Sequence, residues 1–218
     1  MSSDVVFRAF PVAAGLFENA EGDAGLLDAA EERRAVAMEP GSALRFRAGR
    51  LALRRFAGGL LDVPASELAA AYDCPQCGPD GDRAHGRPGY SRNGRQLPVI
   101  LSLARAGGWI LMAGLAHPGD DVRLGVDLED PSAVGFPGFD ATTLTVAETA
   151  TVAQQQVGLR DAMRARLWAR KEAWLKMTGG GLRTAPAAVD VLSLPGLRDI
   201  APEESGLPGH FAAALAVG

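Results

Sequence analysis

The chain has 218 residues, of which 47% are hydrophobic, and its formal net charge is −4. This length and hydrophobic content suffice for one large domain or two small ones with apolar cores. The negative charge argues against broad binding to nucleic acids or anionic membranes, so any anion-binding site must be a local basic cluster.

The N-terminal region predicts a cytoplasmic protein. Charged residues interrupt the apolar positions of the first thirty residues, so we expect no signal peptide. No segment is apolar enough to cross a membrane. Together with the negative net charge, this leads us to expect neither a membrane nor a nucleic acid among the partners.

In the first 118 residues, apolar periodicity predicts three strands and two helices around one long loop. The loop spans 73–94, where Pro, Gly, Asp and Arg dominate. The last two strands are expected to join at Gly107-Gly108. In chain order, we expect a strand over 5–10, helices over 25–38 and 42–57, and strands over 97–103 and 109–115.

The remaining residues predict a second half of comparable size. A half-buried strand over 123–129 leads to a capping box at Thr145, whose helix should end near residue 158. The longest helix, 161–177, should stop at the glycines of 179–181, because glycine removes the steric preference for helix. Strands over 189–192 and 211–217 close the chain. The order predicts an α+β fold with two similar halves, 1–118 and 119–218.

Two carboxylates lie on the predicted strand 123–129. Side chains alternate along a strand, so Asp127 and Glu129 project from the same face and repel each other unless a cation or a proton lies between them. The pair indicates either a hard-metal site or a polar strand edge that faces solvent.

A third carboxylate and a cation lie on the long helix. Glu172 and Lys176 are one turn apart on one face, which is also the spacing of an ordinary surface ion pair. Together with the strand carboxylates, they form a set typical of a Mg²⁺ site. This ion prefers oxygen ligands and commonly shares a few carboxylates with substrate phosphates.

The two segments resemble a known paired signature. Gly125-Val-Asp-Leu-Glu129, followed by Trp168-Ala-Arg-Lys-Glu-Ala-Trp-Leu-Lys176 and its glycine-rich exit, is similar to the signature of 4′-phosphopantetheinyl transferases. The length and element order are similar to the monomeric, two-halved type that activates peptide and polyketide synthetases. The resemblance covers about residues 42–192 and implies a pseudo-twofold fold.

The resemblance implies a holo-acyl-carrier-protein synthase activity. Such an enzyme moves 4′-phosphopantetheine from coenzyme A to a serine of an acyl or peptidyl carrier protein and releases 3′,5′-ADP. It implies Mg²⁺ ligation by Asp127, Glu129 and Glu172. The serine hydroxyl must also lose its proton, and Glu172, acting directly or through a metal-bound water, is the candidate base. Lys176, one helical turn further on, is suited to stabilising the phosphates.

A weaker resemblance concerns the contacts to coenzyme A. His85-Gly-Arg-Pro88 and Phe46-Arg-Ala-Gly-Arg50 are similar to segments of the family, whereas Ala104-Arg105 stands where the family usually has Ser-His. An arginine offers a permanent charge and a forked donor set to a phosphate. The residues expected to contact coenzyme A are Arg47, Arg50, Arg87, Arg105, Lys171 and Lys176.

Other functions stay open on the residues alone. A non-catalytic module that binds coenzyme A or a nucleotide would explain the missing Ser-His pair. A Mg²⁺-dependent nuclease or phosphohydrolase could use the same carboxylates, although the chain has no phosphate-binding GxxxxGK[ST] loop. Cys74 and Cys77 fit free thiols best; a zinc site with His85 and a disulfide are the alternatives.

Overall fold

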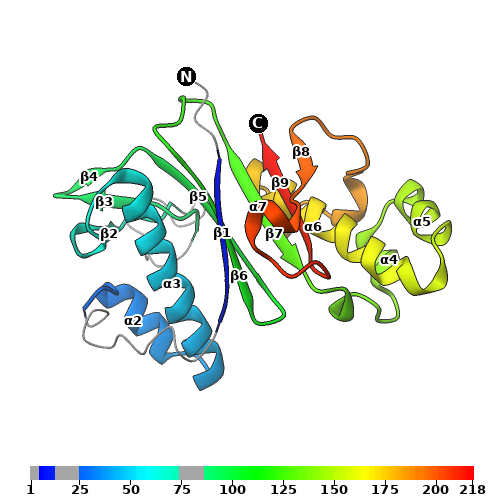
Figure 1. Ribbon diagram of the computed structural model, residues 1–218, viewed down its shortest axis with the longest axis horizontal. Coiled ribbons are helices and arrows are strands. Elements are labelled where there is room, and N and C mark those ends of the chain that lie inside the picture. The colour runs from blue at the N-terminus through cyan, green and yellow to red at the C-terminus, as the bar shows by residue number, and fades with distance from the viewer. Residues whose placement is uncertain (1–4, 13–24, 74–85) are drawn as a thin grey trace. The chain divides into compact units, whose positions relative to one another are not determined.

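The structure is a computed structural model that describes residues 5–12, 25–73 and 86–218 (Figure 1). The hypotheses on Cys74, Cys77 and His85 lie outside the described residues. The chain forms two compact units. Unit 1 comprises residues 1–6, 11–101 and 114–118, and unit 2 comprises residues 7–10, 102–113 and 119–218. The segments 7–10 and 102–113, which we expected in the N-terminal half, thus group with the C-terminal one.

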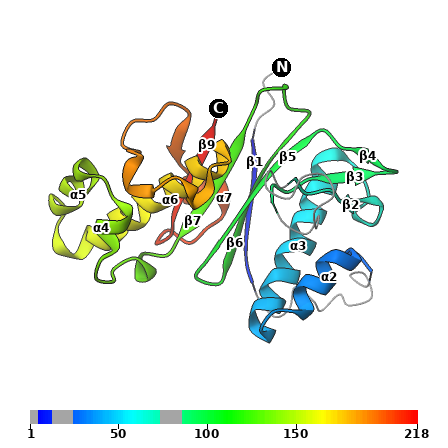
Figure 2. The same cartoon turned by 180° about the vertical axis from the view of Figure 1, so that it is seen from behind.

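In the described part of unit 1, two helices lie beside a small antiparallel sheet. The helices α2 and α3 pack on each other (Figure 2). Helix α3 begins with Pro40, whose fixed φ suits a first helical turn, and ends where Asp62 turns left-handed. It is longer than predicted. The elements are α2 (Ala29–Val36), α3 (Pro40–Leu61), β2 (Ala69–Ala70), β3 (Tyr90–Arg92) and β4 (Arg95–Gln96), with sheet order β2-β3-β4.

A three-stranded sheet has residues from both units. Its order is β1-β6-β5, with β1 spanning Val6–Pro11, β5 Val99–Ala106 and β6 Trp109–Ala116. Between β5 and β6, Gly107 and Gly108 have φ of 52° and 77°. Positive φ at both central residues is the conformation of a two-residue hairpin turn. The three strands and the turn are confirmed.

Unit 2 has an antiparallel sheet with helix α6 packed on it. Strand β7 (Leu124–Glu129) pairs with β9 (Ala212–Val217), which also pairs with β8 (Leu197–Asp199). Helix α6 (Arg160–Thr178) lies along β7 and β9 (Figures 1 and 2). It ends at Gly179, whose φ of 75° forms the expected cap. The remaining helices are α4 (Phe139–Thr143), α5 (Val146–Ala153) and α7 (Pro202–Ser205).

Alanines line the contact between α6 and its sheet. Ala165, Ala169 and Ala173 recur every four residues along α6 and are fully buried, and Ala214 and Ala216 of β9 belong to the same core. Small side chains at spacing i, i+4 let a helix backbone approach a sheet closely. The two tryptophans of α6, Trp168 and Trp174, are partly buried and pack against this core.

Several predicted elements are wrong. Residues 189–192 form no strand, because the Val191 N–H donates to the Glu148 side chain instead of to a neighbouring strand. Helix α5 ends at Ala153, earlier than expected. The loop predicted over 73–94 contains β3, and β8 was not predicted. The short 3₁₀ helices are η2 (Ala65–Glu67), η3 (Pro131–Ala133), η4 (Val157–Leu159), η5 (Gly181–Arg183) and η6 (Pro186–Ala188). Among the helices of the described ranges, none has the length and apolarity needed to cross a membrane.

Candidate active site

The candidate site in unit 2 lies where β7 meets α6. The Nζ atom of Lys176, on α6, is 2.5 Å from Oδ1 of Asp127 and 3.2 Å from the backbone oxygen of Val126. The side chain of Asp127 is 7% exposed and that of Lys176 is 32% exposed. The strand and the helix that we predicted separately therefore meet through a half-buried ion pair.

Asp127 also has an unsatisfied oxygen. Its Oδ2 atom is buried and accepts no hydrogen bond from an N–H group of the residues that the structure describes, while a protonated Glu129 carboxyl group can donate to the Asp127 side chain. A buried carboxylate oxygen without a partner destabilises the fold, because it has lost its hydrogen bonds to water and has formed none within the protein. A further cation or hydrogen-bond donor near this oxygen would therefore be stabilising.

Burial raises the pKa of all three carboxyl groups. For Glu129, burial and then the charge of Asp127 raise the pKa from 4.5 to about 8. Burial also raises the pKa of Asp127, against the opposing effect of Lys176. For Glu172, burial and the charge of Asp127 raise the pKa. The three carboxyl groups thus lie close enough to affect one another, and a cation would relieve their repulsion.

The donor set fits Mg²⁺ in its chemistry. The three carboxyl groups, which include the buried Asp127 Oδ2, supply the oxygen ligands that this ion prefers. In the described part of the chain, however, no three His, Cys, Asp or Glu side chains are arranged to hold a metal ion. The cation that Asp127 contacts is Lys176. The ligand types fit, and their gathering around a metal stays a prediction.

Comparison with known families identifies this region. Residues 123–214 match the family model of the 4′-phosphopantetheinyl transferase superfamily. The chain contains a domain of this superfamily. The match includes β7, α6 and β8 and most of unit 2 beyond residue 118, and no curated protein matches the sequence significantly.

The raised pKa of Glu129 predicts how the stability of the protein depends on pH. Its pKa of about 8 in the folded protein exceeds its ordinary value of 4.5, so the folded state retains a proton that the unfolded chain loses. Raising the pH between these values therefore destabilises the metal-free protein. Glu129→Gln removes this penalty, and we expect its melting temperature to exceed that of wild type at about pH 9 but not at about pH 5.

The measurement is thermal unfolding in EDTA at both pH values. Asp130→Asn, one residue further on, is the matched control, because hydrogen bonds from Ser132 lower the pKa of Asp130. This control should lose stability at high pH instead of gaining it. A Glu129→Gln advantage that is equal at both pH values would contradict the assigned pKa.

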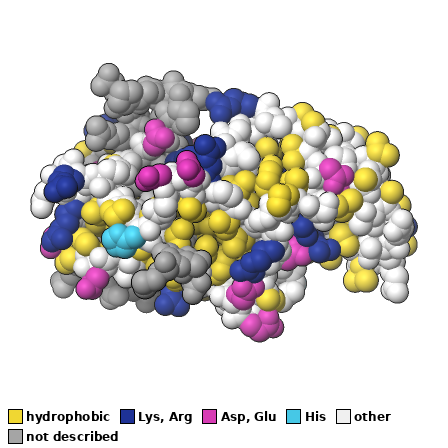
Figure 3. Space-filling model, turned by 90° about the horizontal axis from the view of Figure 1, so that it is seen from above, with side chains coloured by type: hydrophobic (Ala, Val, Ile, Leu, Met, Phe, Trp, Pro, Cys, Tyr) yellow, Lys and Arg dark blue, Asp and Glu magenta, His cyan; other side chains and the backbone are white. Residues whose placement is uncertain are grey.

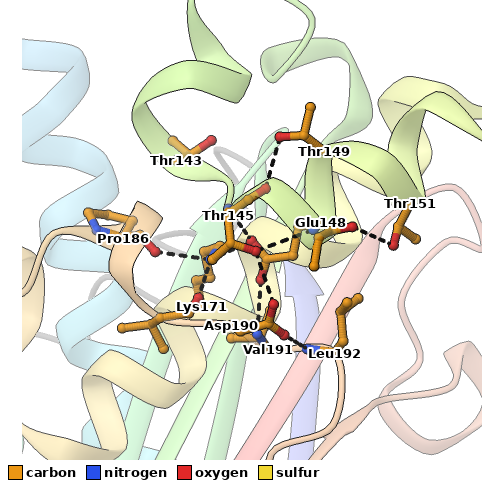
Figure 4. A network of polar contacts seen from close by, with 12 residues as sticks. Thr143, Thr145, Glu148, Thr149, Thr151, Lys171, Pro186, Asp190, Val191 and Leu192 are labelled. Carbon is orange, nitrogen blue, oxygen red and sulfur yellow. Dashed lines mark hydrogen bonds and ion pairs between the residues drawn. The ribbon is translucent and has the colours of Figure 1, made fainter.

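Lys171 of the transferase domain does not contact solvent. Its side chain is fully buried, and its Nζ atom lies 2.7 Å from Oε2 of Glu148 and 3.0 Å from the backbone oxygen of Pro186 (Figure 4). It also donates to the backbone oxygen of Val189. An ammonium group has three N–H donors, and these three acceptors use them all. The prediction that Lys171 binds a phosphate of coenzyme A is therefore wrong; its role is structural.

The four predicted arginines fall in different units. Arg47 and Arg50, on α3, and Arg87 belong to unit 1, whereas Arg105, on β5, belongs to unit 2 with the carboxylates. Arg105 is exposed at the end of its strand. Their convergence on one ligand stays a prediction. On one face of the molecule, basic and acidic side chains are interspersed, which agrees with local anion binding at most (Figure 3).

In unit 1, Arg47 and Arg50 already have partners. Arg47 forms an ion pair of 2.8 Å with Glu32 at the surface. The guanidinium of Arg50 lies over the ring of Tyr72, 4.0 Å from its centroid, and 3.8 Å from Oε1 of Glu31. Arg87 is exposed, and its backbone pairs with that of Asp73. An anion at Arg47 or Arg50 would have to compete with these carboxylates.

Two positioning side chains were missed. The Oγ atom of buried Ser102 on β5 accepts a hydrogen bond of 3.0 Å from the Val126 N–H, beside Asp127. Glu148 accepts from the N–H groups of Thr145 and Val191 and pairs with Lys171 (Figure 4). The capping box pointed to Glu148 as a helix cap, but nothing in the local sequence signals the distant partners.

Proposed function

We propose that the protein transfers the 4′-phosphopantetheine group of coenzyme A to a serine hydroxyl of an acyl or peptidyl carrier protein. The serine oxygen forms a bond to the β-phosphorus of coenzyme A, the bond from that phosphorus to the bridging oxygen breaks, and 3′,5′-ADP leaves. The observation that supports this best is the contact between Asp127 and Lys176 inside the matched region.

The carboxylates have distinct roles in this proposal. Asp127, Glu129 and Glu172 would hold Mg²⁺, which when bound neutralises negative charge on the pyrophosphate and on the leaving group. Glu172 is the base that takes the serine proton. Without a metal ion, burial and the nearby charge of Asp127 raise the pKa of Glu172, whereas ligation of Mg²⁺ would lower it.

The basic residues would bind the phosphates. Lys176 is about a third exposed and one helical turn from Glu172, so its ammonium can exchange Asp127 for a substrate phosphate. Arg47, Arg50, Arg87 and Arg105 are the remaining proposed phosphate contacts. The proposal extends to the monomeric, two-halved type that serves peptide and polyketide synthetases, on the resemblance in length and element order.

The intact mass of a carrier protein tests this function. Incubated with the protein, coenzyme A and Mg²⁺, an apo carrier is expected to gain one phosphopantetheine group at its serine. A carrier whose serine is replaced by alanine is the control and should gain nothing. If coenzyme A binds but neither peptidyl nor acyl carriers gain mass, the protein is a binding module and the proposal is wrong.

Removal of divalent cations gives a further prediction. We expect EDTA to stop the transfer and excess Mg²⁺ to restore it, because the carboxylates would repel the pyrophosphate without a cation between them. The readout is the rate of mass gain before and after dialysis against EDTA. Full transfer in EDTA would contradict the metal role of the three carboxylates.

A further inference from the structure

Gly125 of β7 lies directly under the backbone of α6. A Cβ atom built at this position would lie 2.1 Å from the Ala173 oxygen and 2.6 Å from the Met177 nitrogen. Both distances are below 3.0 Å, a separation that real Cβ atoms essentially never cross. Because the crowding atoms belong to backbone, no side-chain rotation can relieve the contact.

Space, not backbone conformation, requires glycine here. Gly125 has no positive φ, and it pairs with Ala216 of β9 in the regular register of the strand. An L-amino acid could adopt this strand conformation without strain. The constraint is therefore the approach of α6.

This contact lies between the two halves of the candidate site. Gly125 precedes Asp127 by two residues on β7. The two backbone atoms that crowd it belong to the residues that follow Glu172 and Lys176 on α6. The separation of helix and strand at Gly125 therefore sets the distance between the carboxylates of β7 and the side chains of α6.

We propose that Gly125 is a positioning residue that fixes this separation for catalysis; the inference rests on the proposed function. Any larger residue would push α6 away from β7 by about 1 Å, and a misplacement of that size can lower a rate about 100-fold. It would part Lys176 from Asp127, which are in hydrogen-bond contact at 2.5 Å. Glu172 would move away from Asp127 with the same helix.

The test is Gly125→Ala with three readouts. We expect kcat to fall about 100-fold, with a smaller change in KM for coenzyme A, because the reacting groups move while every proposed phosphate contact except Lys176 lies outside α6. Mn²⁺ binding, measured by electron paramagnetic resonance without substrates, should weaken about tenfold. Thermal unfolding reports whether the variant is folded.

Gly114→Ala is the matched control. Gly114 is also a strand glycine, in β6, and a Cβ atom there would lie 2.4 Å from the Leu60 side chain and 2.8 Å from that of Phe56. This crowding is in unit 1, whereas the carboxylates belong to unit 2. We expect Gly114→Ala to lose stability but to retain the wild-type kcat and Mn²⁺ affinity.

A double-mutant cycle separates positioning from general damage. If Gly125 acts through α6, Gly125→Ala should weaken Mn²⁺ binding in the wild type but add little in a Glu172→Gln background. If Gly125→Ala does not fold, Ala173→Ser is the second variant. It adds one hydroxyl group to the same buried core and is expected to lower kcat in the same way.

The outcomes distinguish the two proposals. Wild-type protein that binds Mn²⁺ but transfers nothing would refute the proposed function, while the Mn²⁺ cycle would still decide on Gly125. A folded Gly125→Ala variant with wild-type kcat and Mn²⁺ affinity would overturn the inference, as would equal losses in both backgrounds of the cycle. If the wild type neither transfers nor binds Mn²⁺, both proposals are wrong.

Discussion

Asp127→Asn is expected to lower the rate of phosphopantetheine transfer about 1000-fold while the protein stays folded. Asparagine has the size of aspartate, but its neutral amide cannot hold Lys176 through one atom and a second cation through the other. The Asp127 carboxylate pairs with Lys176 through Oδ1, and its buried Oδ2 accepts from no N–H group in the described part of the chain. Transfer followed by the intact mass of the carrier measures the loss.

The stability of Asp127→Asn separates this loss from unfolding. Burial raises the pKa of Asp127, so the folded state binds a proton more tightly than the unfolded chain does, and the charged form costs stability as the pH rises. The variant should therefore melt no lower than wild type at about pH 9. Asp130→Asn, just beyond β7, is the activity control and should transfer at the wild-type rate.

Either of two results would contradict this assignment. Near-wild-type transfer by Asp127→Asn would remove Asp127 from the site. A loss of transfer accompanied by a lower melting temperature would show instead that Asp127 is needed for folding. That result would contradict the destabilisation of its charged form by burial.

The sequence predicted β7 and α6 as separate elements because both have strong periodic patterns, and the resemblance implied that their side chains share one site. Alternation along β7 placed Asp127 and Glu129 on one face, and helical spacing placed Glu172 and Lys176 on another. Patterns of this kind define which side chains share a face. The contact between Asp127 and Lys176 then follows from the packing of α6 on the sheet.

The environment of Lys171 could not be predicted from helical spacing. A helical pattern gives the direction of a side chain but not what covers it. Lys171 is covered by Glu148 and by the segment 186–191, which lie far from it in the sequence. The same distant contact explains the failed strand over 189–192, because the N–H of Val191 is taken by Glu148.

Gly125 shows the limit of motif reading. In the sequence it is a glycine within a predicted strand, which predicts either a bulge or a close backbone approach. The regular pairing with Ala216 excludes a bulge at this position. The close approach became visible only with the carbonyl of Ala173 in place, 2.1 Å from where a Cβ atom would lie.

Lys171→Met is expected to destabilise the protein by about 3–5 kcal/mol, because it leaves the buried Glu148 carboxylate without its cation. Both side chains are fully buried, so water cannot replace the lost ammonium. Methionine keeps most of the length of the lysine side chain, so the loss reports the charge and its hydrogen bonds. Urea unfolding measures the change in the free energy of unfolding.

Lys176→Met, on the same helix, is the matched counterpart. Its ammonium is about a third exposed, and Asp127 can take up a proton when the lysine is lost, so the effect on stability should be much smaller. Its effect on transfer should be the larger one, because no other α6 cation contacts Asp127 in the described residues. The two variants should thus have opposite effects. Lys171→Met should lower stability and leave the KM for coenzyme A unchanged, whereas Lys176→Met should lower the rate of transfer. A raised KM for coenzyme A in a stable Lys171→Met protein would show that Lys171 does contact a phosphate, contrary to its buried position.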